Sequence, residues 1–344
     1  MAGSAAGFFS TLLEGRVKVR LIIPGDPAQA LPELRFQANP VYNLYHYLRT
    51  LAERPQPPAI PPPEDMARLA PQVRRQRLPQ PLGLLWSRWE EAIAASTSAA
   101  ELRSSGPWRW RHSARRLFAL MARSEEPYRE HVWPQHQPAI HEALDTIRRH
   151  LMPCYEDLFA GHARLLHMHW PPSITVHLVG DCYLAQGGYS HPLTVDAHGN
   201  RGLQLIETVL HEATHVMDMA SPDPGRASAV LLRALGAGRL KLSPRRHLWQ
   251  VWHGLIFWSA GEAVQRFFDP TYDPYALRFG LYRQMSLIGR DDLYEEPWRR
   301  YTAGELSLEE MARLIAERVD SARRPVRLRR LLGARLALRA PSEH

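Results

Sequence analysis

Cysteine and lysine are both scarce in this chain. Only Cys154 and Cys182 occur among 344 residues, without a CxxC or a Cys/His knuckle spacing, which excludes a cysteine-rich zinc module. The two thiols could form one disulfide or be unrelated. Lys18 and Lys241 are the only lysines, so the formal charge of +8 is carried almost wholly by arginine. These charges are spread along the chain without a basic cluster interleaved with aromatics, and we expect no nucleic-acid partner.

Long apolar runs are also absent. The most apolar stretch, residues 251–260, is too short for a transmembrane helix and contains His253, so we expect no transmembrane span. Residues 1–13 lack a basic n-region and have only a short apolar run, so no signal peptide is recognisable. The mature form of an exported protein could look the same. The compartment therefore stays open, with a cytoplasmic location favoured.

The composition is that of a globular protein with a large core. Hydrophobic residues make up 45% and charged residues 23%, while 29 Pro and 21 Gly indicate long irregular connections. The Pro-rich segment 55–63 has no periodicity and is the best linker candidate. We place a region of unknown role at residues 1–105 and the main domain at residues 106–344.

Hydrophobic periodicity predicts an α+β fold with a small sheet and a mostly helical C-terminal half. We interpret His131, His136 and His141 as surface or capping residues because they are not in ligand spacing. The Arg-rich end, 323–339, is expected to be a docked amphipathic helix. The predicted strands are 17–23, 173–180 and 187–196, and the principal predicted helices are 41–53, 82–95, 113–123, 138–151, 205–218, 227–235, 246–268, 275–287, 293–301 and 306–319.

The sequence HEATH at residues 211–215 is an instance of HExxH. Residues four apart lie on the same face of an α-helix, so His211 and His215 can bind one metal ion. Glu212 lies beside them, where a carboxylate can take a proton from a zinc-bound water. Apolar residues flank this stripe, which predicts a helix buried in a core. Buried imidazoles and carboxylates need partners, and a metal ion satisfies both.

Two other interpretations of this motif stay open. His211 and His215 could be ordinary hydrogen-bonded core histidines. Glu212 and His215 also spell the Glu-x-x-His of a di-iron carboxylate bundle, but such a site needs a second Glu-x-x-His on another helix, and none is found.

The third metal ligand is predicted from the helix at 246–268. Glu262 is the only acidic residue within it, and a lone carboxylate in so apolar a helix needs a cation. Ala260 and Gly261 would allow another helix to approach closely. The alternative partner for Glu262 is Arg266, one turn further along the same helix.

HEATH after two strands, with Glu262 on a later helix, resembles the gluzincin branch of zinc metallopeptidases. The resemblance covers residues 171–268 and implies a zincin-like fold, in which a small sheet precedes the HExxH helix. It departs from thermolysin-like members, which have Asn and Asp where this chain has Gly261 and Arg266. The longer metzincin motif is also absent, since Asp218 and Ser221 occupy its places.

The resemblance implies one zinc ion per chain, held by His211, His215 and Glu262. It also implies a tyrosine or histidine from the C-terminal helices that stabilises the oxyanion, for which Tyr275 is our choice. The other candidates are Tyr272, Tyr282 and His253.

The expected function is zinc-dependent hydrolysis of peptide bonds in a peptide or protein substrate, with Glu212 activating a zinc-bound water. Two alternatives keep the zincin fold. One is hydrolysis of a non-peptide amide, and the other is a catalytically silent zinc-containing binding protein. A metal-free structural protein is a further alternative.

Overall fold

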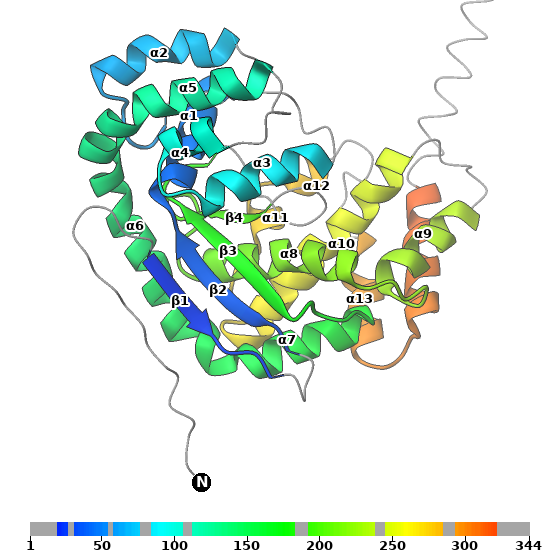
Figure 1. Ribbon diagram of the computed structural model, residues 1–344. Coiled ribbons are helices and arrows are strands. Elements are labelled where there is room, and N and C mark those ends of the chain that lie inside the picture. The colour runs from blue at the N-terminus through cyan, green and yellow to red at the C-terminus, as the bar shows by residue number, and fades with distance from the viewer. Residues whose placement is uncertain are drawn as a thin grey trace, which may run out of the picture. The chain divides into compact units, whose positions relative to one another are not determined.

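The structure is a computed structural model that describes residues 19–26, 31–53, 58–75, 84–105, 112–182, 192–237, 245–284 and 293–321 (Figure 1). It divides into two compact units. The first comprises Met1–Gly161, His169–Ser221 and Arg266–Pro270, and the second comprises the remainder. The predicted domain boundary at residue 105 falls inside the first unit. Whether residues 1–105 and 106–344 are separate folding domains stays a prediction.

The first unit contains a four-stranded mixed sheet in the order β1-β2-β3-β4 (Figure 1). β1 pairs with β2 antiparallel, whereas the β2–β3 and β3–β4 pairs are parallel. β2 alternates half-buried with buried residues, as expected for a strand with one face on a core. The strands are β1 (Val19–Ile23), β2 (Glu33–Ala38), β3 (Ser173–Val179) and β4 (Leu193–Asp196).

These strands confirm the predicted strands at 17–23 and 173–180 within the described residues. The predicted strand at 187–196 is confirmed as β4 from residue 193, and residues 187–191 lie outside the described part. The region before residue 105 supplies two of the four strands, β1 and β2. Since β2 pairs with β3, this region and the later part of the chain share one sheet.

Helices make up most of the remaining structure, and the expected α+β class is confirmed. The first helices, in chain order, are α1 (Pro40–Glu53), α2 (Glu64–Arg75), α3 (Leu84–Ala95), α4 (Ala99–Ser105) and α5 (His112–Pro127). They are followed by the π-helical turn η2 (Tyr128–Val132), α6 (Trp133–Thr146), the π-helical turn η3 (Ile147–Leu151), α7 (Met152–Leu166) and α8 (Leu203–Ala220).

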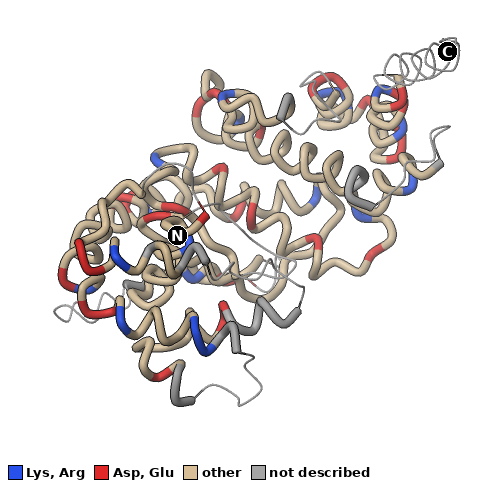
Figure 2. Tube along the Cα trace, turned by 90° about the horizontal axis from the view of Figure 1, so that it is seen from above, with Lys and Arg blue, Asp and Glu red and all other residues tan. Residues whose placement is uncertain are grey.

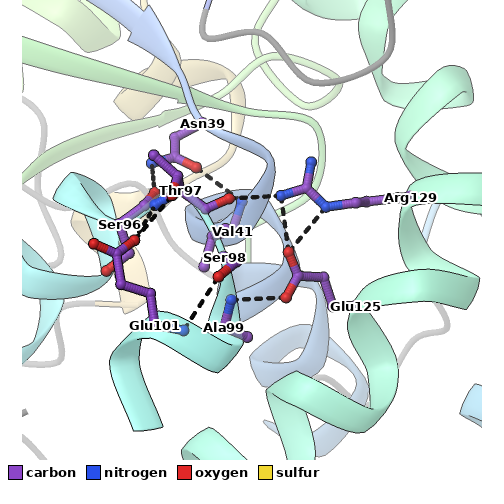
Figure 3. Close-up of polar contacts among 9 residues, drawn as sticks. All are labelled: Asn39, Val41, Ser96, Thr97, Ser98, Ala99, Glu101, Glu125 and Arg129. Atoms are coloured by element: carbon purple, nitrogen blue, oxygen red, sulfur yellow. Dashed lines mark hydrogen bonds and ion pairs between the residues drawn. The ribbon is translucent and has the colours of Figure 1, made fainter. Parts of the chain in front are cut away.

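Asn39, directly after β2, joins the sheet to two helices (Figure 3). Its Oδ1 accepts a hydrogen bond from the Val41 amide at 2.9 Å, which caps the first turn of α1. Its Nδ2 donates to the carbonyl oxygens of Ala94 at 2.7 Å and Ser96 at 2.9 Å, at the end of α3. One buried side chain therefore satisfies a helix start and a helix end together.

Two side chains cap the start of α4 in the same network (Figure 3). Ser98 Oγ accepts from the Glu101 amide at 3.1 Å, and Glu101 Oε2 accepts from the Thr97 amide at 3.0 Å. Glu125 of α5 adds an acceptor for the Ala99 amide at 2.7 Å. These contacts fix α4 against α5.

The helices predicted at 113–123 and 138–151 belong to one helical run that contains both π-helical turns. A π turn holds more residues than an α turn, so the residues after it do not face where a 3.6-residue period places them. His136, in α6 after η2, is fully buried. The prediction that it is a surface or capping residue is wrong, whereas His131 and His141 are exposed as expected.

The second unit is helical among its described residues. The predicted helix at 275–287 is wrong as a single helix: α11 and α12 are separated at Gly280, whose φ of +60° ends the first of them. The Arg-rich end, 323–339, lies outside the described residues. The helices are α9 (Ala227–Ala237), α10 (Arg245–Phe267), α11 (Tyr275–Arg278), α12 (Leu281–Gln284), α13 (Glu295–Thr302) and a helical segment at 308–321.

None of the described helices is long and apolar enough to cross a membrane, as expected from the sequence. Basic and acidic residues are interspersed along the described chain (Figure 2). The absence of a nucleic-acid partner stays a prediction.

Candidate metal centre

The candidate site is built on α8, which is buried along most of its length. The helix begins after Gly202, whose φ of +55° suits glycine, and it ends at Ser221. Ser221 Oγ accepts from the His169 amide at 2.8 Å, which ties the end of the helix to the segment before β3. Apolar residues such as Leu205, Ile206, Val209, Leu210 and Ala213 are buried at 1% exposure or less. This helix confirms the one predicted at 205–218.

His211 and His215 converge on one face of α8. Both side chains are buried, and their Nε2 atoms lie 3.3 Å apart with the rings nearly perpendicular, at 82°. Two nitrogens that each lie about 2.0–2.1 Å from a tetrahedral zinc ion are separated by about 3.3–3.4 Å. The spacing of the two Nε2 atoms therefore fits two ligands of one zinc ion.

Burial controls the protonation of the groups on this helix. It lowers the pKa of His215 to about 4, so the imidazole is neutral at physiological pH, as a metal ligand must be. It raises the pKa of Glu212 to about 8, since a carboxylate in an apolar core is poorly solvated. A cation beside Glu212 would favour the carboxylate form.

Two further carboxylates share the face of α8 that carries the histidines. Glu207 lies one turn before His211, Asp218 lies three residues after His215, and both are buried. We did not assign either residue a role from the sequence. Their spacing of three or four residues from a histidine was the signal that could have placed them on the same face of the helix as the candidate ligands.

Glu262 and Tyr275 lie in the second unit, on α10 and at the start of α11. Glu262 is half-buried, and its Oε2 accepts a hydrogen bond from Trp298 Nε1 at 3.4 Å. The Tyr275 ring stacks with Phe257 at a centroid distance of 6.3 Å. Their roles as third ligand and oxyanion donor stay predictions.

His253 is the other metal-ligating side chain on α10. It lies nine positions before Glu262, which at about 100° per residue places the two on opposite faces of the helix. The His253 ring contacts Trp249 and Phe257 at centroid distances of 4.5 and 4.8 Å. Only one of the two can therefore face a given metal ion.

Tyr282 and Tyr272 are also placed within the second unit. The buried Tyr282 hydroxyl donates to the Gly254 carbonyl oxygen of α10 at 3.5 Å. The backbone oxygen of Tyr272 accepts from Gln265 Nε2 at 2.8 Å. These contacts connect both tyrosines to α10, and neither contact tests a role in stabilising an oxyanion.

No protein-family model matches the chain, and no curated protein or solved structure matches it significantly.

Proposed function

We propose that the protein is a zinc-dependent metallohydrolase that cleaves peptide bonds, with a zincin-like arrangement around α8. The observation that carries the proposal is the 3.3 Å separation of the His211 and His215 Nε2 atoms on a buried helix, with Glu212 between the two residues in sequence. Two imidazoles at this spacing, one turn apart, match the ligand geometry that zinc prefers.

A zinc ion bound there would supply a Lewis acid that polarises the peptide carbonyl and acidifies water. His211 and His215 would hold it through Nε2. Glu212 follows a ligand directly, so its carboxyl group can take the proton of the attacking water and pass it to the leaving amine. The apolar surroundings of α8 strengthen these interactions because they exclude bulk water.

The third ligand in this proposal is Glu262, with His253 as the competing candidate from the opposite face of α10. Glu262→Gln keeps a hydrogen-bond acceptor for Trp298 but removes the charge, so we expect zinc affinity to fall at least tenfold. His253→Gln should leave it unchanged. The reverse pattern would assign the third position to His253 and contradict the gluzincin-like ligand set.

The decisive experiment combines zinc analysis with digestion of a broad peptide library by wild type, Glu212→Gln and His215→Ala. Wild type should hold about one zinc per chain and cleave peptides. Glu212→Gln should keep the zinc while cleavage falls roughly a hundredfold or more. His215→Ala should lose both, which separates loss of the base from loss of the metal.

Other outcomes identify the alternatives. If wild type binds zinc and cleaves no peptide, the peptidase proposal fails, and small amides should then be tried as substrates. If it cleaves neither class but binds peptides equally with and without Glu212→Gln, it is a binding protein. A wild type that holds no zinc and keeps its stability in chelator would refute the metal site itself.

A further inference from the structure

The carboxyl ends of β2, β3 and β4 form a second polar region, separate in sequence from the α8 histidines. The three strands are parallel, so they end at the same edge of the sheet, where open parallel sheets commonly bind ligands. Asp181 and Cys182 follow β3 after Gly180, and both are buried. The proposed hydrolysis uses neither of them.

Cys182 lies against a histidine from α1. Its Sγ is 3.2 Å from His46 Nδ1, and both side chains are buried. The rings of Tyr42 and Tyr45 contact the His46 ring edge-on, at centroid distances of 4.6 and 5.0 Å, which fixes its orientation. A thiol at this distance from an imidazole can give up its proton to it.

The backbone of β3 holds this pair together through Asn43. Asn43 Oδ1 accepts from the Gly180 amide at 2.7 Å, and its Nδ2 donates to the Leu178 carbonyl oxygen at 3.1 Å. Cys182 is two residues beyond Gly180, and His46 is about one turn beyond Asn43 on α1. The thiol and the imidazole are therefore brought together by a specific clamp between α1 and β3.

A positive charge acts on the same thiol. Arg49 follows His46 by three residues on α1. Burial opposes the charge on Arg49, but Tyr45, Glu53, Glu90 and Cys182 outweigh it and raise the guanidinium pKa. Because this coupling is mutual, the guanidinium favours the thiolate of Cys182, but Arg49 also pairs with Glu53 at 3.3 Å and with Glu90 at 3.6 Å, and these carboxylates offset part of that effect. The charged and titratable groups around the pair are Tyr42, Tyr45, Arg49 and Glu53 on α1, Glu90 on α3, and Asp181 beside the thiol.

The same edge carries buried polar atoms that a small polar ligand could bind. His136 packs on Gly180, where an added Cβ would lie 2.2 Å from its ring, and its Nδ1 contacts the Tyr128 hydroxyl at 3.0 Å. Its Nε2 and that of His198 are buried without a hydrogen-bond partner in the described part of the chain. Their ring centroids are 6.0 Å apart. Buried polar atoms usually have a hydrogen-bond partner, which an ordered water or a small polar ligand could supply here.

We propose that Cys182 and His46 form a second reactive centre, in which the Cys182 thiolate attacks small hydroperoxides. His46 takes the thiol proton, the sulfur attacks the terminal, hydrogen-bearing peroxide oxygen, the O–O bond breaks and an S–O bond forms. The leaving alkoxide or hydroxide takes the proton back from His46. The net products are a Cys182 sulfenic acid and an alcohol or water.

Cys154 is a control within the same chain. It is half-buried, its thiol donates to the backbone oxygens of His150 and Leu151, and burial raises its pKa. Its sulfur contacts backbone oxygens, whereas the Cys182 sulfur contacts an imidazole. The chain has no other cysteine, so mass spectrometry of the two peptides reports each thiol separately.

The test treats the full-length protein with hydrogen peroxide at pH 6.5, traps sulfenic acid with a dimedone probe, and also measures iodoacetamide alkylation from pH 5 to 10. We expect Cys182 to react at least tenfold faster than Cys154 at pH 6.5. The midpoint of its alkylation profile should lie below the ordinary thiol value of about 8.5. His46→Gln should slow Cys182 at least tenfold at pH 6.5 and little at pH 10, where hydroxide forms the thiolate.

Two results would overturn the proposal. One is a Cys182 that reacts no faster than Cys154 at pH 6.5. The other is a His46→Gln variant that changes the rate equally at all pH values, which would indicate altered access rather than a lost base. The comparison of the two thiols in wild type needs no variant, so it stands even if His46→Gln fails to fold.

Discussion

Asn39→Ala should be among the most destabilising single substitutions in the first unit. The change removes the cap of α1, worth about 1 kcal/mol. It also removes the donors to the Ala94 and Ser96 carbonyl oxygens, and each buried carbonyl left without a donor costs about 1–3 kcal/mol. Asn39 is only 2% exposed, so water replaces these bonds poorly. The sum is a loss of about 3–7 kcal/mol in the free energy of unfolding.

Urea unfolding followed by circular dichroism measures this loss, and two variants give the matched controls. Asn39→Ser keeps an oxygen that can cap α1 but loses both donors, so it should lie between wild type and Asn39→Ala. Ser98→Ala removes one exposed cap from α4 and should cost about 1 kcal/mol. An Asn39→Ala variant within about 0.5 kcal/mol of wild type, or no weaker than Ser98→Ala, would refute the reasoning.

Three more predictions concern metal, pH and close packing. Zinc at a hundred times its dissociation constant should stabilise wild type by about 2.7 kcal/mol in thermal melts, and it should not stabilise His211→Ala. If zinc stabilises both proteins equally, His211 is not a ligand. Burial lowers the pKa of His136 to about 3, below the unfolded value of about 6.5. As the pH falls, the unfolded chain therefore binds a proton before the folded one does, and the free energy of unfolding should fall between pH 6.5 and 3 by up to about 1.4 kcal/mol per pH unit. Urea midpoints measured against pH should not show this fall for His136→Gln. If the variant has the same pH dependence as wild type, His136 is not its source. In Gly254→Ala the new Cβ would lie 2.3 Å from the buried Tyr294 hydroxyl, and urea unfolding should show a loss of about 1–3 kcal/mol in stability. In Gly236→Ala the new Cβ meets no atom within 4 Å, so this variant should not be destabilised. Equal stabilities of the two variants would show that the Tyr294 side chain moves aside at no cost.

Local patterns in the sequence predicted much of the fold. Alternation gave β1 and β3, and a 3.6-residue period gave α1 and α8, because each pattern depends on residues within one element. The burial of His136 and the helix break at Gly280 could not be predicted from such local patterns. The surface prediction for His136 rested on the lack of ligand spacing, which does not report burial, and the residue lay between two predicted helices. Glycine is tolerated inside helices as well as at their ends, so Gly280 alone did not locate the break.

In the candidate site, too, the sequence predicted the arrangement of residues within one helix but not the contacts between elements. His211, Glu212 and His215 lie on one helix, so their arrangement follows from spacing alone, and their burial followed from the apolar flanks. Glu262 and Tyr275 come from other elements, and no local period states how elements pack. The contact between Cys182 and His46 joins residues 136 apart in sequence and had no sequence pattern to indicate it.

The position of β2 in the sheet has a consequence for synthesis of the chain. Gln37 pairs with His177, 140 residues further on. A ribosome adding about 5–20 residues per second needs roughly 7–30 s to make that intervening length. During this interval the β1–β2 hairpin can form, but the edge of β2 that will bind β3 has no partner strand, and Leu34 and Phe36 lack the core that later buries them completely. Nascent chains of this protein should therefore expose an apolar strand edge that chaperones can bind until β3 emerges.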